Sequence, residues 1–167
     1  MKISGDGLAN GAPAETDASQ FRGRDVVSQA EAGFSAAVWV GAVSSEYCQI
    51  QLFNPASSGV VVLIDKIDLS PSADMRMYVG QYDSRLGSDV GNGKNLYSGK
   101  SDSLSELRSQ TDVSILGAEV YSVYMNKYEF YTVAPMYPWI LPENTGMIVG
   151  AGTVNISIRT SIFFREI

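Results

Sequence analysis

Short runs of apolar residues alternate with turn-forming residues from Phe34 to the end of the chain. The runs are rich in Val, Ile, Tyr and Phe, and clusters of Gly, Pro, Asn, Asp and Ser separate them. Runs of this length are typical of β-strands, whose successive side chains point to opposite faces of a sheet. The pattern predicts strands over residues 35–43, 47–53, 60–69, 73–82, 118–124, 128–133, 147–150 and 154–165.

The apolar face is clear in two of these strands and interrupted in a third. In residues 47–53 the apolar face is formed by Cys48, Ile50 and Leu52. In residues 73–82 it is formed by Met75, Met77 and Val79. In residues 60–69 the predicted face is formed by Val61, Leu63, Ile67 and Leu69. Asp65 interrupts that face, so we expect the strand to leave the core midway.

The remaining segments are assigned less regular structures. Residues 83–112 are polar and predict an irregular region with one short helix over 101–108, because Ser103 and Glu106 have capping-box spacing. The strands at 118–124 and 128–133 flank a three-residue turn and predict a hairpin. Prolines bracket residues 139–141, so this piece is expected to be an extended connection rather than a central strand.

These elements predict one all-β domain over residues 33–167, with two packed antiparallel sheets. No internal repeat occurs, and the strands do not alternate with the long amphipathic helices that a parallel sheet requires. Residues 1–32 are rich in Gly, Ala, Ser, Asp and Gln, and they predict an extended, flexible arm. The arm is either a disordered terminus or a segment that lies across a neighbouring subunit, with Phe21, Arg22 and Arg24 as candidate contacts.

Composition excludes several function classes. The formal net charge is −6, which argues against nucleic acid as the main ligand, because such binding needs clustered Lys and Arg. Histidine is absent and Cys48 is the single cysteine, so catalytic triads, Cys-His dyads and His-ligated metals are excluded. We expect no cofactor, no metal and no enzymatic activity. We also expect neither export by a signal peptide nor insertion in a membrane, because no apolar run is long enough.

The aromatic residues are the candidate binding residues of the sandwich. Four tyrosines and one tryptophan cluster in the C-terminal half: Tyr121, Tyr124, Tyr128, Tyr131 and Trp139. Such side chains fill sandwich cores with one polar tip exposed, they are enriched at protein interfaces, and they stack on sugars. All three roles remain open from the residues alone.

Two segments resemble small virion structural proteins of tailed bacteriophages. The first is the turn Asn54-Pro-Ala-Ser-Ser-Gly59 before a Val-rich strand, with Ser57 where Gly is common. The second is Pro142-Glu-Asn-Thr-Gly146 before a closing strand that ends in Phe164-Arg-Glu166. The resemblance covers about a third of the chain, and the order and spacing of the two motifs carry it.

The resemblance implies a jelly-roll β-sandwich that decorates or cements a capsid. It further implies the major capsid protein as partner, a homo-oligomer that is a trimer rather than a dimer, synthesis in the host cytoplasm and a final place on the capsid surface. The alternative is a tail or fibre module that recognises host glycans through Tyr121, Tyr124 or Trp139. A third reading, an enzyme on a jelly roll such as a cupin or glycan hydrolase, lacks histidine.

Overall fold

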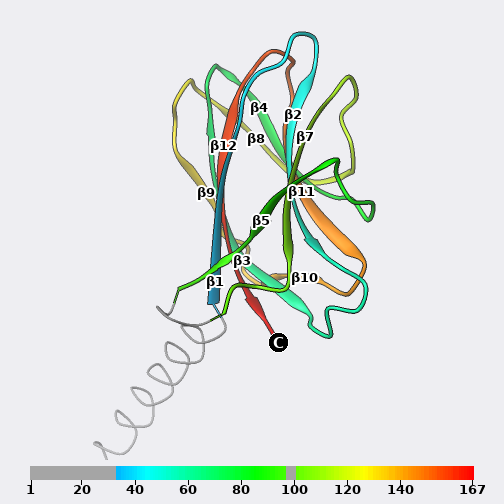
Figure 1. The fold of residues 1–167 in the computed structure, drawn as a ribbon. Coiled ribbons are helices and arrows are strands. Elements are labelled where there is room, and N and C mark those ends of the chain that lie inside the picture. The colour runs from blue at the N-terminus through cyan, green and yellow to red at the C-terminus, as the bar shows by residue number, and fades with distance from the viewer. Residues whose placement is uncertain (1–32, 97–100) are drawn as a thin grey trace, which may run out of the picture.

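The computed structural model describes residues 33–96 and 101–167 of the chain (Figure 1). Within these residues all regular structure is β-strand, which confirms the predicted all-β class. The arm predicted over residues 1–32, together with Phe21, Arg22 and Arg24, lies outside the described residues.

The strands fall into two groups by length. Eight have seven residues or more and are packed into the sandwich, and these are β1 (Gly33–Val40), β2 (Tyr47–Asn54), β3 (Val62–Pro71), β4 (Met75–Gln81), β7 (Glu106–Asp112), β8 (Ala118–Met125), β11 (Thr145–Ala151) and β12 (Ile158–Glu166). The others lie at sheet edges and are β5 (Ser88–Asn92), β6 (Lys94–Asn95), β9 (Tyr131–Val133) and β10 (Trp139–Leu141).

The strands form two sheets in which every pairing is antiparallel. Sheet A has the order β10-β3-β12-β1-β6, with β9 also paired to β3, and sheet B has the order β5-β7-β2-β11-β4-β8. Without β5, β6 and β7, each sheet keeps four positions: β1, β12, β3 and β9/β10 in one, and β2, β11, β4 and β8 in the other. This strand order is that of a jelly roll. The predicted antiparallel sandwich of jelly-roll type is therefore confirmed.

The core lies between the sheets and follows the two-residue period. The predicted inward residues of β2 and β4 are buried, with exposed fractions of 0–1% for Cys48, Ile50, Leu52, Met75, Met77 and Val79. Opposite them, Phe34 of β1 stacks on Phe164 of β12 with ring centroids 5.5 Å apart. Each large apolar side chain buried in this way stabilises the fold by about 1.5–3 kcal/mol.

Strand β3 corrects the predicted apolar face. Val62 and Ile64 are buried, whereas Leu63 is only half-buried. The pairing with β12 shifts by one residue, because Phe163 pairs with Lys66 while its neighbour Phe164 pairs with Ile64. Asp65 is the extra residue of a β-bulge, and an extra residue exchanges the two faces of a strand. Ile67 and Leu69 therefore share the core with Val62 and Ile64, and the strand does not leave it.

Two further predictions are wrong. Residues 101–108 contain no helix: Leu107 pairs with Leu52 of β2 and is buried, so strand pairing prevails over the local capping pattern. The segments 118–124 and 128–133 do not form a hairpin, because β8 pairs with β4 in sheet B and β9 pairs with β3 in sheet A. The loop between them crosses from one sheet to the other. Residues 139–141 form a three-residue edge strand, which agrees with the prediction that they are not central.

Candidate functional site

Two of the predicted tyrosines join the edges of the two sheets. The hydroxyls of Tyr121 on β8 and Tyr131 on β9 lie 2.9 Å apart and form a hydrogen bond. This hydrogen bond, followed by burial, raises the pKa of Tyr121 above its ordinary value. Both rings are half-buried against the core, as is Trp139, which pairs with Ile64. The hydrogen bond between Tyr121 and Tyr131 thus connects the two sheets at this edge.

Tyr124 and Tyr128 are exposed and lie in different places. Tyr124 pairs with Arg76 on the outer face of sheet B, and 69% of its surface is exposed. Tyr128 is 70% exposed and lies in the β8–β9 loop, where its backbone N–H donates to the carbonyl of Pro71 at the end of β3. The structure therefore divides the predicted aromatic cluster between an internal bridge and two separate exposed rings.

Exposed apolar side chains are frequent in the segment of the chain that forms this edge of the sandwich. The segment from β8 to β10 contains six exposed large apolar side chains besides Tyr128, which we call the β8–β10 surface: Val120, Tyr124, Phe130, Met136, Tyr137 and Ile140. Met136 and Tyr137 are the most exposed, at 90% and 79%. Apolar side chains concentrated on one edge are typical of a surface that another protein covers.

The backbone of β8 is not shaped for pairing with another strand. β8 is the last strand of sheet B, and its pairing with β4 shifts between Val79 and Gly80, which leaves Val120 in a bulge. Bulges at edge strands interrupt the row of free N–H and C=O groups that would accept an added strand. Contact at this edge is therefore expected through side chains rather than through strand addition.

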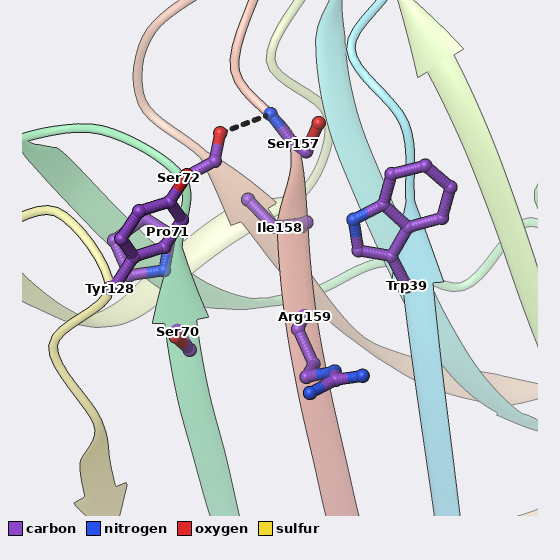
Figure 2. Close-up of a pocket in the computed structure, with 8 residues that line it drawn as sticks. All are labelled: Trp39, Ser70, Pro71, Ser72, Tyr128, Ser157, Ile158 and Arg159. Atoms are coloured by element: carbon purple, nitrogen blue, oxygen red, sulfur yellow. Dashed lines mark hydrogen bonds between the residues drawn. The ribbon is translucent and has the colours of Figure 1, made fainter.

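A groove lies on the outer face of sheet A, at the end where the β8–β9 loop reaches it (Figure 2). Its volume is about 220 Å³, and it is lined by Trp39, Ser70, Pro71, Ser72, Tyr128, Ser157, Ile158 and Arg159. Three neighbouring strands form its floor: Arg159 of β12 pairs with Trp39 of β1 on one side and with Ser70 of β3 on the other. Figure 2 shows Arg159 between these two strands, with Trp39 and Tyr128 on opposite sides of β12.

The loop that carries Tyr128 is fixed in an uncommon conformation. Tyr128 has φ 58°, in the left-handed region, where a bulky residue is strained. The hydrogen bond from the Tyr128 N–H to the Pro71 carbonyl measures 2.9 Å, and the N–H of Lys127 donates to Asp74 Oδ1 at 2.7 Å. These hydrogen bonds to β3 and to the β3–β4 turn place the ring at the rim of the groove.

The indole of Trp39 on the opposite rim lies over Gly41. A Cβ atom at Gly41 would be 3.1 Å from Cη2 of the indole, closer than side chains normally pack. The glycine thus gives the ring room to lie along its own strand, although 65% of Trp39 remains exposed. The two-residue period gave a signal for this residue, since Trp39 lies between the inward-facing Val38 and Val40. Neither Trp39 nor Arg159 is among the site residues predicted from the sequence.

The remaining candidate chemistry is structural. Cys48 is fully buried, and burial raises the pKa of its thiol, which agrees with a role in packing rather than in nucleophilic attack. In residues 33–96 and 101–167 no group of three acidic, Cys or His side chains is arranged to hold a metal ion. No helix in that part of the chain has the length and apolarity of a membrane crossing.

No protein-family model matches the chain, and no curated protein matches it significantly in sequence. We therefore infer the function from the geometry of the structure and from the resemblance of the two turn motifs, residues 54–59 and 142–146, to phage virion structural proteins.

Proposed function

We propose that this protein is a non-enzymatic structural component of a bacteriophage virion that decorates and cements the capsid shell. The observation that carries the proposal is the β8–β10 surface on a jelly-roll sandwich. The resemblance of the two turn motifs to phage virion proteins supports the same role. The partners would be further copies of this chain and the major capsid protein.

The β8–β10 surface is the contact we assign to the homo-oligomer. Its apolar side chains come from consecutive segments at the edge of both sheets, and burying them between copies removes them from water. The bulge at Val120 disfavours an open-ended addition of strands, so a closed oligomer formed through side chains is expected. A trimer is the state we propose.

Attachment to the shell would then come from several weak contacts made at once. A trimer that presents three identical surfaces to a regular lattice gains effective concentration from each contact already made. We assign part of this contact to residues 1–32, including Phe21, Arg22 and Arg24. The core described above is built from residues after 32, so removal of the arm should leave the sandwich folded.

The oligomer is tested by replacing the two most exposed residues of the β8–β10 surface. Met136→Ser with Tyr137→Ser should convert a trimer into a monomer in size-exclusion chromatography with light scattering. The matched control is Val113→Ser with Ile115→Ser, which removes exposed apolar side chains from the β7–β8 loop. The control should remain a trimer. A wild-type chain that is monomeric at high concentration contradicts this contact.

Attachment is tested by co-sedimentation with empty shells of the major capsid protein. Wild-type protein should sediment with the shells in saturable amounts. A chain that lacks residues 1–32 should bind at least tenfold more weakly while its circular dichroism spectrum keeps the β-sheet signal. Wild-type protein that stays in the supernatant, or that labels only the tail of intact particles, contradicts the decoration role.

A further inference from the structure

We infer that the groove between Trp39 and Tyr128 binds an acidic saccharide, with Arg159 recognising the carboxylate of the sugar. This site is separate from the β8–β10 surface and does not depend on the decoration role. It also differs from the glycan reading of the sequence, which used Tyr121, Tyr124 or Trp139. Two of those rings are half-buried at the sheet edges.

Arg159 is the arginine that is left without an acidic partner within residues 33–96 and 101–167. The other arginines of this part of the chain form ion pairs: Arg76 with Glu119, Arg85 with Glu106, Arg108 with Glu106 and Arg165 with Asp65. Arg159 is exposed, and its cross-strand neighbours are Trp39 and Ser70. A guanidinium presents two parallel N–H groups that match the two oxygens of a carboxylate.

The charge of the groove favours an anion. Its lining contains no Asp or Glu. The ammonium of Lys127 lies 5.0 Å from the centre of the Tyr128 ring, which adds a second positive charge near the rim. Asp74 of the β3–β4 turn and Glu129 of the β8–β9 loop accept hydrogen bonds from the backbone N–H groups of Lys127 and Asn126, respectively. Arg159 is thus the single charged side chain in the lining of the groove.

The two aromatic rings supply the apolar contact that a sugar ring needs. Trp39 and Tyr128 remain 65% and 70% exposed, while the Trp39 ring lies over Gly41 and a hydrogen bond to Pro71 fixes the backbone at Tyr128. Ordered aromatic side chains bind with little loss of conformational entropy, because few torsions remain to be fixed. The C–H faces of a pyranose can pack against such rings while its hydroxyls point away.

Serine hydroxyls complete the polar contacts. Ser72 Oγ accepts the N–H of Ser157 at 3.0 Å, and Ser157 Oγ accepts the N–H of Ala42 at 3.0 Å. Each of these hydroxyls thereby has its oxygen oriented by the backbone and keeps its own hydrogen for donation to a ligand. The groove of about 220 Å³ suits one sugar unit better than a folded partner. A site of this size, which would bind one carboxylate between two aromatic rings, favours a saccharide over an acidic peptide.

The inference is tested with free sugars in NMR titrations of the full chain. The probes are N-acetylneuraminic acid and glucuronic acid, with glucose as the neutral comparison and a hexaglutamate peptide as the competing acidic ligand. The two indole N–H signals report separately on Trp39 and Trp139, and Trp39→Phe assigns them. We expect saturable shifts of the Trp39 signal with at least one acidic sugar, and an unshifted Trp139 signal.

Variants decide which groups recognise the ligand. Arg159→Gln should weaken binding of the acidic sugar at least tenfold, whereas Arg76→Gln, which removes an exposed arginine from the other sheet, should leave it unchanged. Both substitutions lie on the surface, and unchanged amide spectra elsewhere would show that folding is intact. The inference is overturned if neither acidic sugar shifts the Trp39 signal, if Arg159→Gln binds as well as wild type, or if only the peptide binds.

Discussion

Gly150 on β11 tests how tightly the outer layer of sheet B is packed. A Cβ atom at this position would lie 2.3 Å from Cζ and Oη of Tyr78, whereas non-bonded carbon atoms normally approach to about 3.5–4.0 Å. Tyr78 cannot move aside freely, because it is 1% exposed and its hydroxyl donates to the Leu116 carbonyl at 3.2 Å. Gly150→Ala therefore forces the ring out of its site.

The expected cost follows from the contacts that are lost. Overpacking a filled site costs about 1–3 kcal/mol, and breaking the Tyr78 hydrogen bond adds about 1 kcal/mol. The alanine restricts the unfolded chain and returns about 0.5–1 kcal/mol. Gly150→Ala should thus lower the free energy of unfolding by about 1–3.5 kcal/mol, measured by urea denaturation with tryptophan fluorescence.

Gly87→Ala is the matched control. A Cβ atom at Gly87 would meet the Gln110 amide oxygen at 3.4 Å, an ordinary contact, so its unfolding free energy should change by less than about 0.5 kcal/mol. In a Tyr78→Ala background the Gly150→Ala change should cost little, because the clashing ring is absent. Equal stability losses at positions 87 and 150 would refute the packing argument.

Three further predictions concern hydrogen bonds, protonation and backbone strain. Tyr121→Phe should lower the free energy of unfolding by about 0.5–1.5 kcal/mol, because it removes the hydrogen bond to Tyr131. In a double-mutant cycle, the variant with both Tyr121→Phe and Tyr131→Phe should lose less stability than the sum of the two single variants. Strict additivity would argue against the hydrogen bond. Burial raises the pKa of Tyr78 above its ordinary value of 10.0. The folded protein then keeps the Tyr78 proton at a pH where the unfolded chain has lost it. Its contribution to the free energy of unfolding is therefore fully present below pH 10 and falls as pH rises above it. In denaturation series from pH 8 to 11, Tyr78→Phe should lose less stability with rising pH than the wild-type chain. Ser57 has φ 74°, a value that favours glycine, so Ser57→Gly should raise the melting temperature, and a lower one would show that the hydroxyl contributes more than the strain costs.

The strands with a regular period were predictable from the sequence. Met75, Met77 and Val79 alternate without interruption, and the structure buries all three. Strand β5 was missed because all its residues are at least partly exposed, so no apolar period marks it. The bulge at Asp65 could not be predicted from the two-residue period either, because one extra residue exchanges the two faces of the strand. The bulge arises from the pairing with β12, which lies about 100 positions further along the chain.

The candidate sites were predictable only in part. The aromatic residues predicted a binding surface within residues 121–139, and the β8–β10 surface lies in this segment. Tyr121 and Tyr131, however, form a hydrogen bond with each other. The groove was not predictable, because it unites residues 39, 70–72, 128 and 157–159. Only the side-by-side placement of β1, β12 and β3 brings Trp39 and Arg159 together, and that order is a property of the whole jelly roll. Ser57 takes the left-handed conformation, which glycine adopts more readily than serine.

Cryo-electron microscopy of intact particles that carry this protein is the most direct test of the decoration role. We expect density for the jelly roll at regularly repeated positions over the capsid lattice, grouped in threes, with the β8–β10 surface buried between copies. Density confined to the tail, or isolated copies with Met136 and Tyr137 facing solvent, would contradict it.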